Sequence, residues 1–418
     1  MLMTSNQNSN IALTWNQLKN YPIIENDRIN GLTNSYSNLR LYNINKKEDI
    51  KVTLYRDNHA WCPYCQKIWL WLEFKKIPYK IKKITMRCYG NKEDWYLKKV
   101  PSGMLPAIEI NNNIITESDY IIVSLENLFG PLGLQMDNKN TLILRNLERE
   151  IFRHWCIWLC YPSLTKKQEE NKKNQFIQSL KLLEHHLEKS ENNFLDPVYS
   201  GKSIIPGTAD IIFIPYLERM NASLAYYKGF LIREIFPSIN KWFSSLENLP
   251  EYLGTQSDFH THAHDLPPQM GGCWPNRSTR QKELSKLIDL GIGLENNEIS
   301  SRSSIIQKDF KLIALNRVYK HRGSIMEVNP LGRSGFDQPL RAALTNLISE
   351  KSCPPSKDSA KGLRYLRDRV SVPRDMPLLS ARYLRQALEK TAKLDGNQEG
   401  PPIPKRNRFD QDPSNFIN

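Results

Sequence analysis

The sequence predicts an α/β domain, an all-α domain and a helix-rich C-terminal extension, in that order. At 418 residues the chain is too long for one ordinary domain, since a domain usually takes about 150 residues. A hydrophobic fraction of 40% is enough to build packed cores. Strand and helix patterns alternate over residues 51–132, whereas helical patterns dominate residues 138–255 and 305–394.

The first helix of the α/β domain is expected to begin at a pair of cysteines, in Trp61-Cys62-Pro63-Tyr64-Cys65. A cysteine in the first turn of a helix lies near unpaired N–H groups and the positive end of the dipole, which favour the thiolate. Pro63 suits that turn because it has no N–H to lose and its φ is already helical. The motif predicts a redox nucleophile. The alternatives are two inert buried thiols or a zinc pair, although zinc needs a second pair of ligands.

The order of elements over residues 51–132 indicates the fold of this domain. The predicted elements are strand 52–55, helix 63–76, strand 79–84, helix 93–99, strands 107–110 and 114–116, and helix 118–128. This order, with a dithiol at the start of its first helix, is typical of the thioredoxin fold.

The Leu105-Pro106 pair directly precedes a predicted strand of this domain. A proline at that point of a thioredoxin-like fold usually adopts the cis form and faces the active cysteine. The backbone of Leu105 is then free to pair with an extended thiol peptide. An ordinary proline at the start of a strand is the alternative.

Residues 138–255 are expected to form an all-α domain. The predicted helices are 141–161, 175–190, 211–220, 232–246 and one from about residue 251, with a charged polar stretch over 166–173. Gly207 is expected to cap the helix that follows it, and Asp210 to complement the dipole of that helix. A thioredoxin-like domain followed by an all-α domain is the two-domain plan of glutathione transferases.

Residues 51–255 resemble the glutathione transferases that use a cysteine, the omega and lambda classes. The resemblance is strongest to the iota class of cyanobacteria and other photosynthetic organisms, and that similarity extends to the C-terminal end. It rests on Cys62-Pro63-Tyr64-Cys65, which is also the glutaredoxin motif, and on the stretch from Lys92 to Pro106. It implies that Cys62 is the catalytic residue and Cys65 a resolving thiol. It also implies a glutathione site made of Pro63, Tyr64, Lys92, Leu105, Pro106, Glu117 and Ser118.

The charges of glutathione explain these assignments, because the tripeptide carries two carboxylates and one ammonium group. By the resemblance Lys92 would bind the glycine carboxylate and Leu105 the cysteinyl backbone. Ser118, at a helix start, would donate to the γ-glutamyl carboxylate, and Glu117 would meet the ammonium group. Taken singly, Lys92 could be a solvated lysine and Glu117-Ser118 a plain helix start.

A cysteine at the active position favours reduction over conjugation, because it attacks the sulfur of the substrate and forms a mixed disulfide. The expected protein is a glutathione-dependent thiol transferase that deglutathionylates a substrate or reduces a small disulfide or dehydroascorbate. Glutathione is the expected co-substrate, no metal is expected, and a homodimer is possible. The alternative is a non-catalytic glutathione-binding scaffold whose basic C-terminal repeats dock on an acidic partner complex.

Aromatic residues on the first helix of the all-α domain suggest a second-substrate pocket. Trp155, Trp158 and Tyr161 lie there, where the helix normally forms a wall of such a pocket. The alternative is that Trp155 and Trp158 belong to the core between the domains.

Residues 256–304 are expected to be a linker that packs on the transferase unit. His260, His262 and His264 alternate in it, and in an extended segment they could converge on zinc or copper, although such alternation is common without metal. Residues 305–394 are expected to hold two repeats, each a helix, a Ser/Pro segment and a second helix. The matching positions are Arg317, Arg322, Ser324 and Pro330 with Arg364, Arg369, Ser371 and Pro377.

The composition of the chain indicates the cellular compartment and the kinds of partner to expect. Seven cysteines without regular spacing favour a reducing cytoplasm, and no run approaches the roughly 18 apolar residues of a membrane span. From residue 301 onward there are 22 Lys and Arg against 12 Asp and Glu, which is +10 of the net +14. These residues suggest a solvated basic face or an acidic protein partner, and nucleic acid is not expected because no aromatic stacking motif accompanies them. Residues 1–50 are expected to be an N-terminal arm, and 395–418 a flexible tail.

Overall fold

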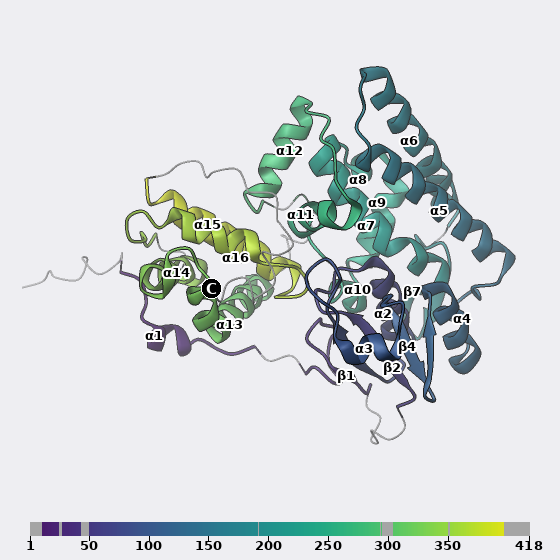
Figure 1. The fold of residues 1–418 in the computed structure, drawn as a ribbon, viewed down its shortest axis with the longest axis horizontal. Coiled ribbons are helices and arrows are strands. Elements are labelled where there is room, and N and C mark those ends of the chain that lie inside the picture. Colours follow the sequence, from purple (N-terminus) through teal and green to yellow (C-terminus); the bar gives the residue numbers. More distant parts are fainter. Residues whose placement is uncertain are drawn as a thin grey trace, which may run out of the picture. The chain divides into compact units, whose positions relative to one another are not determined.

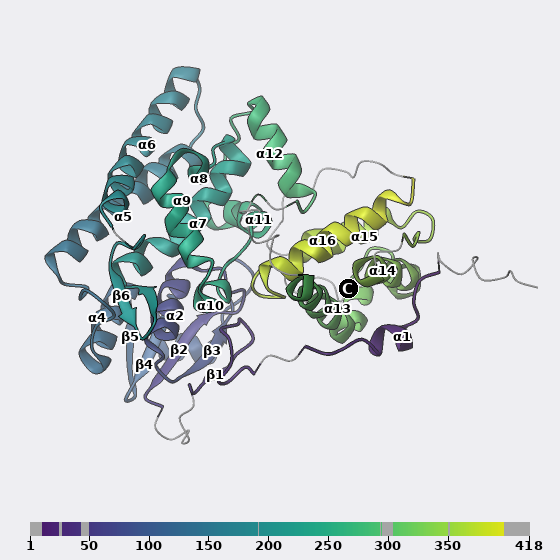
Figure 2. The ribbon, with the colours of Figure 1, turned by 180° about the vertical axis from the view of Figure 1, so that it is seen from behind.

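The computed structural model describes residues 11–24, 27–42, 50–190, 192–292, 294, 304–349 and 352–396. These residues form two compact units (Figures 1 and 2). One unit contains the described residues from 27 to 285, and the other combines residues 11–24 with those from 286 to 396. The expected N-terminal arm is therefore divided between the two units. The expected flexible tail lies, beyond residue 396, outside the described residues.

A five-stranded mixed sheet forms the α/β part of the first unit. Its strands are β1 (Leu39–Arg40), β2 (Val52–Asp57), β3 (Tyr79–Ile84), β4 (Ala107–Ile110) and β5 (Asn113–Thr116). They lie in the order β1-β3-β2-β4-β5, with β2 and β3 parallel and the other neighbours antiparallel. The predicted thioredoxin-like order is confirmed, and β1 adds an edge strand from the expected arm.

Helices cover both faces of this sheet (Figure 1). They are α2 (Pro63–Lys75), α3 (Asp94–Lys99) and α4 (Ser118–Phe129). Because side chains alternate along a strand, Leu54 of β2 packs in the cluster of α2 and α4, whereas Tyr55 faces Tyr96 of α3, with ring centroids 5.6 Å apart. The strand β2 ends at Asp57, a few residues before α2 begins at Pro63.

The helical part of this unit is built around one buried helix. Its elements are α5 (Lys139–Cys160), α6 (Lys166–Glu188), the hairpin β6 (Pro197–Ser200) and β7 (Ser203–Pro206), α7 (Thr208–Lys228), α8 (Ile232–Ile235), α9 (Pro237–Leu246), α10 (Pro250–Leu253), α11 (Phe259–Met270) and α12 (Thr279–Asp289). Almost every residue of α7 is buried, and α7 packs on α2, α5 and α11. It therefore links the helical part to the helix that carries the dithiol.

The start of α7 differs in part from expectation. Gly207 is its N-cap, as predicted. Asp210 is fully buried, however, where it accepts hydrogen bonds from the backbone N–H groups of Leu195 and Asp196 and from the indole of Trp242. Burial raises the pKa of Asp210 to about 7. Its carboxyl group thus joins α7 to the β6 segment and α9 rather than only complementing a helix dipole.

Three of the predicted segments have different boundaries. The charged stretch 166–173 is the first half of α6, because Thr165 caps it by accepting from the N–H of Gln168 and its Lys, Gln and Glu residues favour helix. The predicted helix 232–246 is broken in two by Pro237, which begins α9. The expected linker 256–304 contains two helices, since Asp258 caps α11 through the N–H of Thr261.

The described residues of the second unit form four long helices and one short one, together with the last residues of α12. The long helices are α13 (Ser304–Glu327), α14 (Gly332–Ser349), α15 (Ala360–Arg369) and α16 (Leu378–Lys393), which contact one another as two hairpins. The short helix, α1 (Trp15–Lys19), packs on α13 and α14, and the Trp15 indole donates a 2.7 Å hydrogen bond to Asp337, 322 residues away. The chain end assigned to an arm is thus part of this core.

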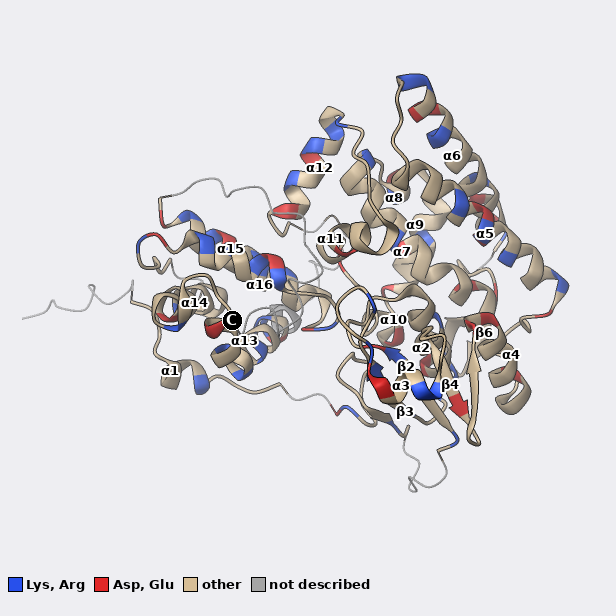
Figure 3. Cartoon of the chain, in the orientation of Figure 1, with Lys and Arg blue, Asp and Glu red and all other residues tan. Residues whose placement is uncertain are grey.

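Several basic residues of the second unit are paired inside it, which corrects the expectation of a solvated basic face for these positions. Arg364 lies 3.0 Å from Glu389, and Arg367 lies 2.7 Å from Asp368; all four are buried. Figure 3 shows acidic positions beside the basic ones on α15 and α16. No helix in the described ranges combines the length and the apolar character that a bilayer crossing requires.

A buried ion pair fastens residues 27–42 to the sheet domain. Arg40 places its Nε 3.0 Å from Oε1 of Glu73 on α2, and its Nη2 donates to Oε2 at 3.1 Å. Thr33 and Tyr79 also donate to the Glu73 carboxylate, at 2.6 and 2.7 Å. The carboxylate is therefore fully bonded although it is buried.

The substitution Arg40→Met should destabilise this unit by about 3 kcal/mol or more, because it leaves the buried Glu73 charge uncompensated. Differential scanning calorimetry of the full chain measures this as a fall in the unfolding temperature of one transition. Lys80→Met is the matched control, since Lys80 is exposed on the neighbouring strand. Equal unfolding temperatures for the two variants would contradict the structural role of the pair.

Candidate active site

The dithiol lies where β2 passes into α2. Cys62 is the N-cap of α2, Pro63 occupies the first helical turn, and the N–H of Gln66 donates to the carbonyl of Cys62 at 3.0 Å. The Cys62 side chain therefore stands at the positive end of the helix dipole, as the sequence predicts.

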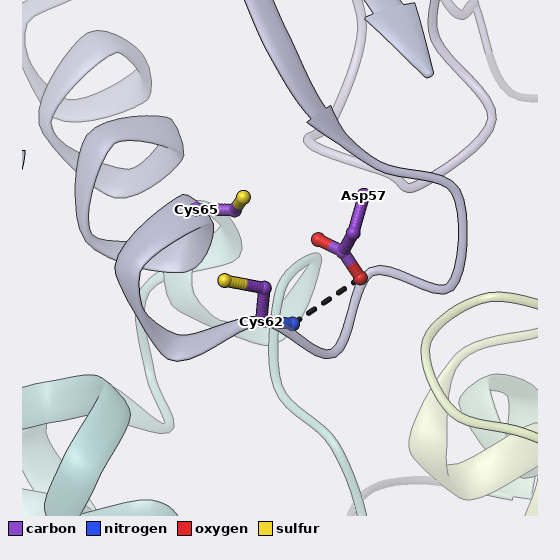
Figure 4. Close-up of side chains that lie close together, drawn as sticks. All are labelled: Asp57, Cys62 and Cys65. Atoms are coloured by element: carbon purple, nitrogen blue, oxygen red, sulfur yellow. Dashed lines mark hydrogen bonds between the residues drawn. The ribbon is translucent and has the colours of Figure 1, made fainter. Parts of the chain in front are cut away.

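Asp57, the last residue of β2, holds the loop that carries Cys62. Its Oδ2 accepts hydrogen bonds from the N–H groups of Trp61, at 2.6 Å, and of Cys62, at 3.2 Å. Its buried Oδ1 accepts none from the described residues. Figure 4 shows the carboxylate facing Cys62 and Cys65, and the ligand atoms of these three residues lie within 4.8 Å of one another. The sequence predictions missed Asp57, although an acid at the end of the preceding strand was a usable signal.

The two thiols differ in their surroundings. Cys65 is 1% exposed and Cys62 is 8% exposed. Burial, followed by a hydrogen bond that Cys65 donates to Cys62, raises the pKa of the Cys65 thiol well above its ordinary value. Cys65 is therefore kept as a neutral thiol, whereas Cys62 is the more exposed sulfur and lies at the N-terminus of α2. This asymmetry favours Cys62 as the nucleophile.

A buried arginine of α7 lies behind the same loop. Arg219 donates to the carbonyl of Trp61 and, at 2.8 Å, to the side chain of Gln66, and its guanidinium lies 5.0 Å from the centre of the Trp61 ring. Burial lowers the pKa of Arg219, and Glu218 and Cys62 oppose that shift. The guanidinium thus places positive charge near the Cys62 sulfur. Nothing in the sequence marked Arg219, which is 158 residues from Trp61.

The expected histidine segment is helical, so its side chains diverge instead of lining one strand face. His260 and His264, four residues apart, contact each other with ring centroids 4.7 Å apart and ring planes tilted by 54°. His262 lies 2.8 Å from Glu218 on α7. Among the described residues, the group of potential metal ligands that converges is Asp57, Cys62 and Cys65, and it includes no histidine.

Lys92, Leu105 and Pro106 lie on the segments around α3. The Lys92 ammonium donates to the carbonyl of Thr85 at 3.1 Å and is half-buried. Burial lowers the pKa of Lys92, and the electrostatic attraction of Cys65, Glu93 and Cys62 opposes that shift. The Leu105-Pro106 bond is cis, as predicted.

The start of α4 carries the other expected glutathione ligands. Glu117 is exposed at the N-cap with φ of 64°, an uncommon conformation for a residue other than glycine, and Ser118 is buried. Next to them, Asp119 pairs with Lys67 and with Arg145. Burial raises the pKa of Asp119, but the two cations outweigh it and hold that pKa below its ordinary value. The sequence predictions did not include this charged cluster.

Two of the three aromatic residues assigned to a second-substrate pocket are core residues. Trp155 is 2% exposed and Trp158 is 1% exposed, because α5 turns its aromatic stripe toward α6 and α7. Their indoles donate to Ser223 and Glu169, at 3.0 and 2.8 Å. Tyr161, by contrast, is 61% exposed at the end of α5. Tyr64 packs on Tyr216 of α7, with ring centroids 5.6 Å apart.

Comparisons with known proteins agree with this fold. Residues 61–128 match the family model described as glutathione S-transferase, N-terminal domain. The chain is 24% identical over 196 residues to glutathione S-transferase DHAR2 of Arabidopsis thaliana, and 28% identical over 199 residues to glutathione S-transferase L3 of the same plant. Each alignment covers 47% of this chain, and they cover 84% and 79% of the relatives.

Among solved structures, the dehydroascorbate reductase of Chlamydomonas reinhardtii covers 49% of this chain and 91% of its own, with 23% identity and a TM-score of 0.40. The sheet domain, followed by the helical region, has the plan of a glutathione transferase, and a helix-rich extension is added to it. Residues 61–128 are thus similar to the N-terminal domain of glutathione S-transferases. The iota class and the repeats of the extension stay predictions.

The substitution Asp57→Asn should slow closure of the Cys62–Cys65 disulfide while it keeps the loop that carries Cys62. An asparagine oxygen can still accept from Trp61 and Cys62, so the loop is kept, but the carboxylate that can take the Cys65 proton is lost. We expect closure of the Cys62–Cys65 disulfide to slow by about 100-fold. Stopped-flow measurement of glutathione release from the mixed disulfide checks this, with Asp94→Asn, an exposed acid on α3, as the control. Unchanged release would exclude Asp57 as the proton acceptor.

Proposed function

We propose that the protein is a glutathione-dependent thiol transferase and reductase that forms a mixed disulfide on Cys62. The observation that carries the proposal is the asymmetry of the dithiol: Cys62 is the N-cap of α2, whereas Cys65 is 1% exposed and burial raises its pKa. A cysteine at a helix N-terminus beside a buried neutral thiol suits thiol–disulfide exchange. Relatives named glutathione S-transferase support the same assignment.

The first chemical step breaks the disulfide of a glutathionylated substrate. The Cys62 thiolate attacks the glutathione sulfur, a Cys62–glutathione disulfide forms, and the substrate leaves as a thiolate that takes a proton. Arg219 lies where it stabilises the negative charge of Cys62 before this step. The same thiolate can attack a small disulfide, and dehydroascorbate reduction needs the same two electrons from two glutathione molecules.

The second step releases the enzyme by one of two routes. The thiolate of a second glutathione attacks the bound glutathione sulfur, which yields oxidised glutathione and regenerates Cys62. Alternatively, Cys65 attacks the Cys62 sulfur and releases reduced glutathione, and the proton of Cys65 passes to Asp57. Two further glutathione molecules then reduce the Cys62–Cys65 disulfide. We place this activity in a compartment that supplies reduced glutathione, such as the cytoplasm.

Glutathione would bind across the edge of α2, α3 and α4. In the proposal Lys92 meets the glycine carboxylate, Leu105 and Pro106 the peptide backbone, and Glu117 and Ser118 the γ-glutamyl end. Pro63 and Tyr64 complete the site beside Cys62. Three observations support it: Cys65 and Cys62 attract the Lys92 ammonium, Ser118 is buried at a helix start, and Glu117 has a left-handed backbone.

Metal binding at the dithiol is less well supported than redox chemistry. Asp57, Cys62 and Cys65 provide three converging ligands, whereas a structural zinc site takes four. The hydrogen bonds that Asp57 accepts from the loop also occupy one of its oxygens. The residues present therefore suit proton transfer better than a structural metal.

Replacing each cysteine in turn tests the assignment. Cys62→Ser should lower turnover of hydroxyethyl disulfide with glutathione by at least about 100-fold, because the covalent nucleophile is lost. Cys65→Ser should keep at least about a third of the activity, since a second glutathione can resolve the mixed disulfide. Cys353→Ser, in the other unit, is the control. Full activity of Cys62→Ser would overturn the proposal, and glutathione binding without turnover by the native chain would indicate a binding protein instead.

Lys92→Met tests the glutathione site. Methionine keeps the apolar stem that packs near Gly103 but removes the charge. We expect the KM for glutathione to rise about tenfold, which corresponds to about 1.4 kcal/mol, with kcat little changed. Steady-state kinetics measure this, and Lys98→Met, an exposed lysine of α3, is the control. A fall in kcat at unchanged KM would show that Lys92 acts on the thiols rather than on glutathione binding.

A further inference from the structure

A second pair of thiols lies in the helical part of the first unit, apart from the dithiol of α2. Cys160 is the last residue of α5, and Cys273 follows the end of α11. Cys160 is half-buried, and Cys273 is 8% exposed. The side chains of Cys160 and Cys273 interact with each other, and Cys160 packs against the core cluster to which Cys273 belongs. The two sulfurs are therefore neighbours although 113 positions separate them in the sequence.

The backbone holds the Cys273 segment against the ends of α5 and α7. Gly271 and Gly272, with φ of 78° and 150°, turn the chain after α11. The N–H of Trp274 then donates to the carbonyl of Leu159 at 2.9 Å, and the N–H of Asn276 donates to the carbonyl of Tyr227 at 2.9 Å. A disulfide needs two cysteines on backbone segments held close together, and these bonds keep the segments that carry Cys160 and Cys273 side by side.

The surroundings of the pair shift the pKa values of its two thiols in opposite directions. The hydrogen bond between the two side chains, together with the ammonium of Lys228, outweighs burial and lowers the pKa of Cys160. That same hydrogen bond, followed by burial, raises the pKa of Cys273. Lys228 is itself buried and held 3.1 Å from Glu169. Cys160, the more exposed of the two, is thus the accessible attacking sulfur, and the more deeply buried Cys273 is the resolving one.

Cys156, one turn earlier on α5, provides an internal comparison. It is half-buried like Cys160, and it also contacts the core. Burial, with a smaller effect of Cys160, raises the pKa of Cys156 to about 12. Two thiols on the same helix therefore differ in their surroundings, since the Cys273 side chain interacts with Cys160.

We propose that Cys160 and Cys273 form a second dithiol–disulfide centre, which a low-molecular-weight disulfide such as oxidised glutathione oxidises. The Cys160 thiolate attacks one sulfur of oxidised glutathione, forms a mixed disulfide and releases one glutathione thiolate. Cys273 loses its proton and attacks the Cys160 sulfur, which forms the intramolecular bond and releases the second glutathione. The protein loses two electrons and two hydrogens, and oxidised glutathione becomes two reduced molecules.

Oxidation of this centre would tie the end of α11 to the end of α5. The helix α11 contacts α7 along its length, and His262 of α11 lies 2.8 Å from Glu218. Glu218 in turn accepts from the side chain of Gln66 on α2, at 3.3 Å. The bond would therefore fix one side of the helix layer that supports the first dithiol. This function goes beyond the proposed transferase activity, because neither Cys160 nor Cys273 takes part in it.

The test is peptide mapping of the full chain carrying Cys62→Ser and Cys65→Ser, after incubation with oxidised glutathione and alkylation of free thiols. The native chain is mapped in parallel, so the result does not depend on folding of the double variant. We expect a cross-linked peptide that joins Cys160 to Cys273 and lacks two hydrogens. Cys160 and Cys273 both alkylated, Cys160 left as a stable glutathione adduct, or a cross-link from Cys156 would each overturn the proposal.

Single substitutions test the role of each residue in this reaction separately. Cys273→Ser should stop the reaction at the Cys160–glutathione adduct, whereas Cys156→Ser, the matched control on α5, should leave the cross-link unchanged. Lys228→Gln should slow the first adduct about threefold or more, because the thiolate loses its cation. Formation of a Cys156–Cys273 cross-link at the native rate in Cys160→Ser would also contradict the assignment. None of these outcomes depends on Cys62, so failure here and failure of the proposed transferase activity are distinguishable.

Discussion

The hydrogen bonds from the N–H groups of Trp61 and Cys62 to the Asp57 carboxylate are the contacts on which the site depends. They fix the loop between β2 and α2, so that Cys62 becomes the N-cap of a helix buried against α7. The backbone at Asp57 is itself held, because Arg56 donates to the main-chain carbonyl of Asp57 at 2.8 Å and to that of Ser35 at 2.8 Å. One acidic side chain therefore both positions the nucleophile and lies beside the resolving thiol.

Local sequence patterns predicted the parts of the site that depend on near neighbours. The position of Cys62 at a helix start, the cis bond before Pro106 and the order of strands all follow from spacing and from proline chemistry. The partners contributed from far along the chain could not be predicted. Arg219 reaches Trp61 only after α7 packs on α2, and Trp15 reaches Asp337 only after the second unit folds.

Burial explains why two of the aromatic assignments failed. An apolar stripe on a long helix looks the same in sequence whether it lines a pocket or a core. Trp155 and Trp158 face α6 and α7, where hydrogen bonds to Ser223 and Glu169 satisfy their indoles. Burial also explains why the basic residues of the second unit do not all form a basic surface, since Arg364 and Arg367 are paired with buried acids. Charge counted along a sequence does not distinguish such internal pairs from a basic surface.

The surroundings of the start of α2 make Cys62, and not Cys65, the attacking sulfur. The most direct measurement is rapid-quench peptide mapping of the native chain with limiting oxidised glutathione, which identifies the residue of this pair that carries the first adduct. We expect the early adduct to lie on Cys62 while Cys65 is still a free thiol. An early adduct on Cys65, with Cys62 unmodified, would contradict it.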